Sequence, residues 1–451
     1  RRDFYEARDT AEKLLTMLDG RANIPGSQIA ARVSANLRVW QSLSKLGGAL
    51  ISAVTDLPVY ASAIRYQGRG GLLSGIGEGI GNLVRGRPKG EQRQILGMID
   101  SVADGLIGGV AARFDADDVL SGNMSELMRL YFRMNGLQWW TDTLREGMEL
   151  GTSSWLGGMA GRSWDKLDAN AQRVLRLYNI DDAKWDVLRQ AVHVAEDGRA
   201  YLVPEAMRHV PDGVVRGYIE RAGRTVSDVG IANARADLGD TLRGLIIDQS
   251  MTAVIEPDVR SRYFWTRGTR PGTVPGEVLR FISQFKGFPT ALTRQVFGRE
   301  IYGRGYDTLG DFLKNGKGDM LGLAQLMLAM TAFGYVAMTA KDALKGRSAR
   351  DPTSPAVWAS AMMQGGALGI YGDFLVGQSN RFGQNWLDTA AGPVAGTLSG
   401  LDEIRKRAMK GDDVAASAFR LAVNNTPFLN LFYVRTAMDY LLLYRIQEAL
   451  N

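Results

Sequence analysis

Cysteine is absent from the 451 residues of this sequence, and histidine occurs only twice, as His193 and His209. A chain without cysteine cannot form disulfides or zinc–thiolate sites, and it has no cysteine nucleophile. Neither histidine belongs to an HExxH, facial-triad or GxSxG pattern, so both are expected to be structural. We therefore expect no metal site and no cofactor.

Catalytic carboxylates are equally hard to select, although Asp and Glu together number 48. The adjacent Asp181 and Asp182 precede a helical pattern, where acidic residues cap helices, and Ser163 stands before another. A glycosidase dyad needs two converging carboxylates, and nothing in the sequence singles out such a pair. No catalytic residue is predicted, and the sequence favours a protein that is not an enzyme.

Long apolar runs are few, and the mean hydropathy of -0.13 is that of a globular protein rather than of a polytopic transporter. Two runs, 320–340 and 352–372, hold no charged residue. A helix over the first would be roughly 30 Å long, which matches the hydrocarbon core of a bilayer. Its small and polar residues are spread around the helix, which predicts burial on all sides, in protein or in lipid.

The two runs are predicted to form a helical hairpin, because the glycines in both permit tight pairing. The pattern leaves open whether this hairpin is the core of a soluble body or inserts into a membrane. The apolar residues assigned to it are Met320, Leu323, Leu326, Met327, Met330, Phe333, Val336, Trp358 and Ile370.

Period-two alternation is scarce along the whole chain. Apolar residues recur instead at three- and four-residue spacing, as in Phe4, Ala7 and Ala11. This pattern predicts an all-α fold, an extended multi-helix assembly with buried apolar helices and few or no strands. One short extended piece is expected at 198–204, between a turn signal and Pro204.

Composition divides the chain into three regions. Residues 1–160 form an N-terminal helical region with a glycine-rich link at 68–90. Residues 161–255 form a polar helical middle region, and residues 256–451 carry a basic and aromatic strip followed by apolar helices. The alternate glycines of the link fit neither a Walker nor a dinucleotide-binding pattern, so the link is interpreted as a flexible or closely packed amphipathic segment.

Acidic residues are scarce between 260 and 302, where eight basic residues face only Glu277 and Glu300. Aromatic residues are interleaved with them. This combination predicts contact with an anionic partner, either DNA phosphates or lipid headgroups, and the alternative is a solvated face paired with acidic helices elsewhere. The predicted contact residues are Arg260, Arg262, Arg267, Arg270, Arg280, Lys286, Arg294 and Arg299.

Three segments resemble one protein family: 163–190 (SWDKLDANAQRVLRLYNIDDAKWDVLRQ), 279–300 (LRFISQFKGFPTALTRQVFGRE) and 372–398 (GDFLVGQSNRFGQNWLDTAAGPVAGTL). They are similar to C-terminal portions of the very large internal virion, or ejection, proteins of tailed bacteriophages. The likeness runs over residues 130 to 445 and includes no catalytic motif. The chain also begins without Met, as expected of a segment of a larger protein.

The resemblance implies a protein that is packed in the virion interior, leaves with the genome and reassembles in the host envelope, in the periplasm and inner membrane. There it would form an oligomeric helical core or tube for genomic DNA. The partners that it implies are further copies of the chain, other phage ejection or portal and core proteins, double-stranded DNA and the host inner membrane. The alternative is a helical accessory part of a peptidoglycan-cleaving virion enzyme.

Overall fold

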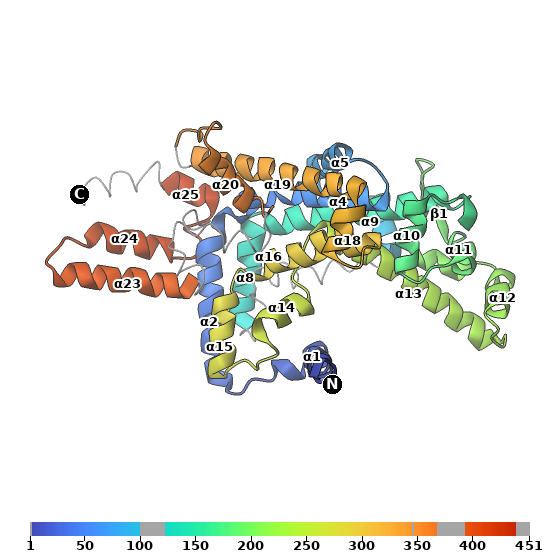
Figure 1. Ribbon diagram of the computed structural model, residues 1–451, viewed down its shortest axis with the longest axis horizontal. Coiled ribbons are helices and arrows are strands. Elements are labelled where there is room, and N and C mark those ends of the chain that lie inside the picture. Colours follow the sequence, from blue (N-terminus) through green and yellow to red (C-terminus); the bar gives the residue numbers. More distant parts are fainter. Residues whose placement is uncertain (1, 100–121, 345–346, 368–392, 439–451) are drawn as a thin grey trace. The chain divides into compact units, whose positions relative to one another are not determined.

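A computed structural model describes residues 2–99, 122–344, 347–367 and 393–438 (Figure 1). Within these ranges the chain is built mainly from helices, and the strands there are limited to one antiparallel pair. The all-α prediction is confirmed.

The chain groups into two compact units, each made of segments that are distant in the sequence. Unit 1 comprises Arg1–Thr55, Leu106–Gln138 and Ile255–Asn451, and unit 2 comprises Asp56–Gly105 and Trp139–Val254. A division of this kind depends on contacts between segments that are distant in the sequence. The local amino-acid composition does not predict such contacts. The three consecutive regions expected from composition stay a prediction.

Unit 2 surrounds a cluster of buried apolar side chains that includes Trp185, Leu202 and Leu245. Removing such side chains from water is the main favourable contribution to folding. The elements of the unit are α4 (Asp56–Gln67), α5 (Leu72–Arg85), α6 (Glu91–Ile99), α9 (Leu137–Met159), η4 (Trp164–Lys166), α10 (Ala169–Leu177), α11 (Asp182–Leu188), β1 (Val192–Val194), β2 (Ala200–Leu202), η5 (Pro204–His209), α12 (Asp212–Arg221) and α13 (Asp228–Ala253). The cluster is formed by residues between α6 and α13.

The strands β1 and β2 form a short hairpin, with Val192 opposite Leu202 and Val194 opposite Ala200. Gly198 in the connecting turn has a φ of +79°, a conformation that side chains with a Cβ rarely adopt. The extended piece expected at 198–204 is thereby confirmed.

Side-chain caps mark the starts of the short helices in this unit. The side chain of Asp181 accepts a hydrogen bond from the Lys184 N–H at 2.9 Å and caps α11, as predicted. Ser163 precedes the 3₁₀ turn η4 without a side-chain cap bond, which corrects the expectation placed on it. Asp168 caps α10 instead, because its carboxylate reaches the backbone N–H groups of Asn170 and Ala171.

Helix α5 packs on α4 through its glycines. A Cβ atom at Gly75 would lie 2.7 Å from Ala61 Cα, and one at Gly79 would lie 2.8 Å from Leu57 Cδ2. The approach at Gly75 leaves no room for a side chain, because the neighbouring atom is backbone, and a side chain at position 79 would require Leu57 to move. Of the two interpretations of the glycine-rich link, close packing therefore holds over Leu72–Arg85.

Unit 1 is organised around α2, whose buried face includes Arg38. The Arg38 Nη1 atom lies 2.5 Å from Glu277 Oε2 of α15, and Gln284 Nε2 donates to the Arg38 carbonyl at 2.7 Å. The helices of the unit are α1 (Arg2–Leu18), η1 (Arg21–Asn23), α2 (Gln28–Lys45), η2 (Leu46–Gly48), α3 (Ala49–Ala53), α8 (Gly122–Met134), α14 (Val259–Thr266), α15 (Val274–Ser283), α16 (Gly287–Ala291), the π-helical turn η6 (Leu292–Phe297), α17 (Gly298–Ile301), η7 (Tyr302–Arg304), α18 (Leu309–Asn315), α19 (Lys317–Leu344), α20 (Pro355–Gln364), α23 (Pro393–Met409), α24 (Ala415–Asn424) and α25 (Phe432–Met438).

Helices α19 and α20 form the predicted hairpin, again through glycine. A Cβ atom at Gly334 of α19 would overlap the carbonyl of Ala361, and one at Gly365 would overlap the carbonyl of Met330. The hairpin and its tight pairing are confirmed as far as residue 367, and Ile370 lies outside the described residues.

Gly334→Ala is expected to lower stability, because the new methyl group would push α19 away from α20. Overpacking of this kind costs about 1–3 kcal/mol. Thermal unfolding followed by circular dichroism measures the effect. The matched control is Gly318→Ala in the same helix, where a Cβ atom meets nothing within 4 Å, so stability should be unchanged or slightly higher. Equal effects of the two substitutions would contradict the close contact.

Candidate functional site

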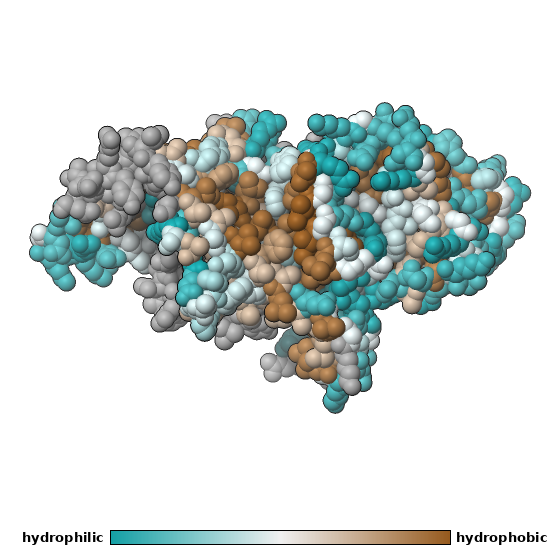
Figure 2. All heavy atoms as spheres, turned by 90° about the horizontal axis from the view of Figure 1, so that it is seen from above, coloured by the Kyte–Doolittle hydropathy of each residue, from teal (hydrophilic) through white to brown (hydrophobic). Residues whose placement is uncertain are grey.

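Helix α19 has two faces, and in the described part of the chain one of them is covered and the other is exposed. On the covered side Leu326, Met330 and Ala337 are buried. The opposite side carries Leu321, Leu328 and Val336, which are 62%, 71% and 52% exposed. Figure 2, the view of Figure 1 from above, shows apolar residues (brown) gathered near the middle of the visible surface among hydrophilic ones.

This exposure corrects the expectation that protein could surround α19 on all sides. Only 33% of the most apolar window of the helix is buried. The physical reason is that α20 packs against the side of α19 that carries Gly334, whereas Leu321, Leu328 and Val336 lie on another side. The core hairpin and the membrane insertion both stay predictions.

Among the described residues, one helix, Gly318–Leu344, is long and apolar enough to cross a membrane. A bent pair, Gln28–Ala53 with Asp56–Gln67, meets the same criterion only if it is counted as a single span. Of the apolar residues predicted for the hairpin, Leu326 and Met330 are buried and Val336 and Trp358 are exposed. The partly exposed ones are Met320, Leu323, Met327 and Phe333.

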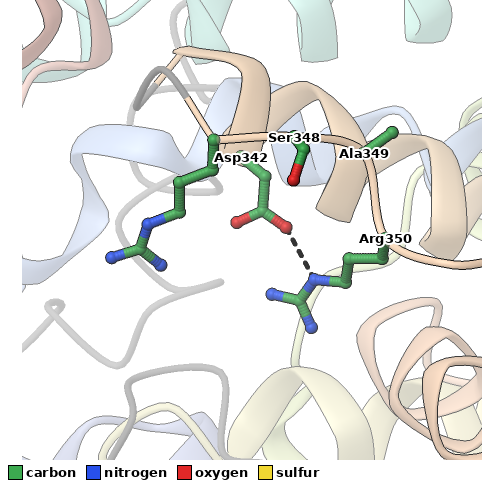
Figure 3. Close-up of a pocket in the computed structure, with 5 residues that line it drawn as sticks. Asp342, Ser348, Ala349 and Arg350 are labelled. Atoms are coloured by element: carbon green, nitrogen blue, oxygen red, sulfur yellow. Dashed lines mark hydrogen bonds and ion pairs between the residues drawn. The ribbon is translucent and has the colours of Figure 1, made fainter.

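Charged residues at both ends of α19 are held by polar partners. Near the start, Asp319 accepts hydrogen bonds from the Tyr306 hydroxyl at 3.0 Å and forms an ion pair with Arg304 at 2.9 Å. Near the end, the buried Asp342 pairs with Arg350 Nε at 2.6 Å (Figure 3). Residues 320–340 carry no charge, so the exposed side of the helix is uncharged over that stretch, where its larger apolar residues are interrupted by the exposed Gln325.

An aromatic pair lies near the segment that joins α19 to α20. The rings of Tyr335 and Trp358 stack at 5.3 Å between centroids. Their polar atoms reach the joining segment, since the Tyr335 hydroxyl donates to the Arg350 carbonyl and Trp358 Nε1 donates to the Pro352 carbonyl. Aromatic rings that combine an apolar body with a satisfied polar atom are enriched at the boundary between apolar and wet surroundings.

The predicted basic strip does not form one surface, because part of it is used inside unit 1. Arg280 is buried and donates to the carbonyls of Gly276 and Thr269. Lys286 is also buried, with its Nζ atom 5.1 Å from the centre of the Trp265 ring. Neither side chain presents its charge to solvent.

Three of the predicted contact residues are exposed: Arg260, Arg267 and Arg270. Arg270 Nε donates to the Ile24 carbonyl at 2.8 Å, and the Arg267 guanidinium lies 5.7 Å from the centre of the Phe264 ring. The side chains of Arg262, Arg294 and Arg299 are partly buried. Solvent-facing positive charge is therefore concentrated in and just after α14.

Sequence reasoning missed one partner of this segment, because Asp258 lies just outside the window in which charges were compared. Its carboxylate caps α14 by accepting from the Ser261 N–H and hydroxyl, at 2.8 and 2.6 Å. Arg294 of η6 donates to the same oxygen at 2.8 Å. Asp258 thus ties the start of α14 to the π-helical turn.

Sequence reasoning also missed Leu321 and Leu328, which are more exposed than any apolar residue that it selected in α19. The comparison of the chain with protein families, curated proteins and solved structures found no match. In the described ranges no three His, Cys, Asp or Glu side chains are grouped as a metal site requires. The candidate sites of this protein are therefore surfaces, namely the open face of α19 and the exposed arginines of 260–270.

The Asp258 interactions predict a pH dependence of stability. Burial alone would raise the pKa of Asp258, but the hydrogen bonds from Ser261 and the charge of Arg294 outweigh it and hold this pKa below its usual value. The carboxylate therefore stabilises the fold above pH ~4, the ordinary Asp pKa, and this contribution disappears as the pH falls through the lowered pKa.

Melting temperatures of the wild type and of Asp258→Asn, measured from pH 7 down to acid, check this. We expect the wild type to be more stable at neutral pH and the difference to shrink at acid pH. A difference that does not change with pH would mean that the charge of Asp258 contributes nothing.

Proposed function

We propose that the chain is a structural internal virion, or ejection, protein of a tailed bacteriophage, without enzymatic activity of its own. In this proposal copies of the chain assemble into a helical core or tube through which genomic DNA crosses the host envelope. The observation that carries the proposal is the open apolar face of the α19–α20 hairpin, bounded by charged residues at both ends of α19.

Lipid is the environment that fits this face best. The uncharged part of α19 is roughly 30 Å long, close to the thickness of a hydrocarbon core. Its exposed Leu321, Leu328 and Val336 would be removed from water by acyl chains, a transfer worth about 25 cal/mol per Å². The Tyr335–Trp358 pair lies beside the joining segment, where an aromatic residue would meet the headgroups.

The composition of α19 suits a protein that must exist both outside and inside a membrane. Alanine and methionine outnumber leucine, phenylalanine and valine in the 320–340 run, which makes insertion only marginally favourable. A chain without cysteine can also unfold and refold without covalent obstacles. Both properties support transfer from the virion interior to the periplasm and inner membrane.

The exposed arginines of 260–270 support the contact with double-stranded DNA. A protein that lines a passage for a whole genome must bind DNA without reading its sequence. Arginine contacts with phosphates provide binding of this kind, and salt weakens it. Arg260, Arg267 and Arg270 are the candidates, because their side chains face solvent.

The segments that resemble ejection proteins are compatible with this role where the structure describes them. Residues 163–190 contain η4, α10 and α11, and residues 279–300 run from α15 into α17. Of the third segment, residues 372–392 lie outside the described ranges. Other ejection, portal or core proteins remain the partners proposed for the assembled state.

Leu328→Glu is expected to abolish carbonate-resistant binding to liposomes, because it places a charge in the middle of the open face of α19. A charge at that depth costs roughly 2.5–3.5 kcal/mol on insertion scales. Flotation of the purified chain with vesicles, followed by a carbonate wash, measures it. The matched control is Leu401→Glu in α23, an exposed leucine away from the hairpin.

In that experiment we expect the wild type and Leu401→Glu to float and resist carbonate, and Leu328→Glu to be washed off. A wild-type chain that does not float at all, or equal behaviour of the two variants, would contradict a membrane role for α19.

Neutralising Arg260, Arg267 and Arg270 together to Gln is expected to weaken binding to double-stranded DNA and to reduce its salt dependence. Each lost phosphate contact lowers the slope of log K against log salt by about 0.9, so the slope should fall by up to about 3. Fluorescence anisotropy with duplexes of unrelated sequence measures this. The control is Arg216→Gln with Arg221→Gln and Arg224→Gln, three exposed arginines in and after α12. An equal decrease of the salt slope in the control variant would contradict the assignment of DNA contacts to Arg260, Arg267 and Arg270.

A further inference from the structure

Helix α5 in unit 2 turns its apolar side outward. Its sequence, LLSGIGEGIGNLVR, places the larger apolar residues on one side of the helix and the glycine and polar residues on the other. In a soluble protein the apolar side of such a helix faces the core. Here Leu73, Ile80 and Val84 are 84%, 45% and 82% exposed.

The outward side is continuous. At about 100° per residue, the residues 72, 73, 76, 80, 83 and 84 fall within one arc of roughly 120° on the helix. Every one of them is leucine, isoleucine or valine, and every one is exposed or partly exposed. No polar side chain interrupts this arc, which we call the α5 apolar arc.

The inward side explains why the helix has this orientation. Gly75 and Gly79 lie against α4, where a larger side chain would require atoms of α4 to move. Beside them Glu78 accepts a hydrogen bond from the Tyr60 hydroxyl at 3.2 Å and pairs with Arg69 at 2.8 Å. Gly75, Gly79 and Glu78 are thus in contact with the rest of the unit, and rotation of the helix would break these contacts.

The exposed charges at the C-terminal end of α5 are positive. Arg85 and Lys89 lie at and just after the end of α5, and both are exposed. Arg87 between them is paired with the buried Asp142 and Glu146 of α9, which neutralise it. Glu78 is the single acidic residue in α5, and Arg69 holds it.

We propose that α5 is an interfacial helix that lies in the surface of a membrane rich in anionic lipid, with the α5 apolar arc among the acyl chains and Arg85 and Lys89 at the phosphates. This proposal rests on the function proposed above only in one respect, namely the identity of the membrane as the host inner membrane. Its evidence lies within unit 2 and does not involve α19.

The dimensions and the charge of α5 both favour lipid as the occupant. A helix of 14 residues is roughly 21 Å long, too short to cross a bilayer, but it suits a helix lying parallel to the surface. Basic residues beside an apolar helix face bind anionic headgroups. A second copy of α5 would bring the same positive charges and no free carboxylate to meet them.

The absence of native cysteine makes a direct test simple, because one introduced cysteine can be labelled uniquely. Ile80→Cys in the arc carries a polarity-sensitive fluorophore such as NBD. The matched control is Val229→Cys in α13, also exposed and also in unit 2. Both labelled full-length chains are mixed with vesicles of phosphatidylglycerol and phosphatidylcholine, with and without nitroxide-labelled acyl chains.

We expect the label at position 80 to shift to shorter wavelength and to be quenched several-fold more by the nitroxide lipids than the label at position 229. No shift with any vesicle overturns the proposal. A shift that appears without vesicles and grows with protein concentration overturns it too, because a second copy would then cover the arc.

Two further measurements separate this proposal from the role of α19. In the Leu328→Glu background the label at position 80 should still report lipid, even where carbonate resistance is lost. A chain that floats and resists carbonate while the label at position 80 stays silent would leave the α19 role standing and refute the α5 role.

The charge contribution is tested with Arg85→Gln and Lys89→Gln combined. Each basic residue changes the affinity on the order of five-fold, so the double variant should bind anionic vesicles roughly 25-fold more weakly. The control is Lys166→Gln with Arg216→Gln, which removes two exposed charges elsewhere in unit 2. Equal loss in both double variants would mean that net charge alone, and not the end of α5, attracts the membrane.

Discussion

Contact between a glycine and a neighbouring backbone decides which side of two helices faces outward. Gly75 of α5 lies against Ala61 of α4, and Gly334 of α19 lies against Ala361 of α20. Where a backbone fills the space that a Cβ atom would need, no larger side chain can point inward. The larger apolar residues of both helices must then lie elsewhere on the helix, and in both cases part of that set is exposed. Close packing inside each unit therefore creates apolar surface outside it.

Packing inside unit 1 also decides which charges of the segment 260–302 reach solvent. A basic stretch is usually interpreted as surface, yet Arg280 and Lys286 are buried here because backbone carbonyls and an aromatic ring accept them. Glu277, one of the few acidic residues of the stretch, is turned to α2 and pairs with Arg38. A buried pair of this kind is costly to form and more costly to break, so it holds α15 against α2 with little freedom. What remains for a partner is the small group of exposed arginines around α14.

The sequence was sufficient for features that depend on local pattern. The three- and four-residue spacing predicted the helices, the turn before Pro204 predicted β2, Asp181 predicted the start of α11, and the glycines of the two apolar runs predicted the α19–α20 pairing. The sequence was not sufficient for features that depend on which neighbouring helix packs against the helix in question. The exposure of Leu328 follows from the side of α19 on which α20 packs, and the direction of the α5 apolar arc follows from the position of α4. Neither feature can be inferred from the sequence of the affected helix alone.

The two apolar surfaces differ in a way that gives each a different physical role in the proposed function. The α5 apolar arc is short and has exposed positive charge at its C-terminal end, so the proposed attraction to anionic lipid would act over roughly a Debye length, about 8 Å at physiological salt, before any apolar contact forms. The uncharged face of α19 exerts no such attraction, and it gains free energy only once it leaves water. The electrostatic attraction of α5 could therefore bring the chain to the membrane surface, and the apolar contact of α19 could keep it there. Because insertion of α19 is only marginally favourable by composition, the local concentration that α5 provides at the membrane would raise the fraction of chains in which α19 inserts.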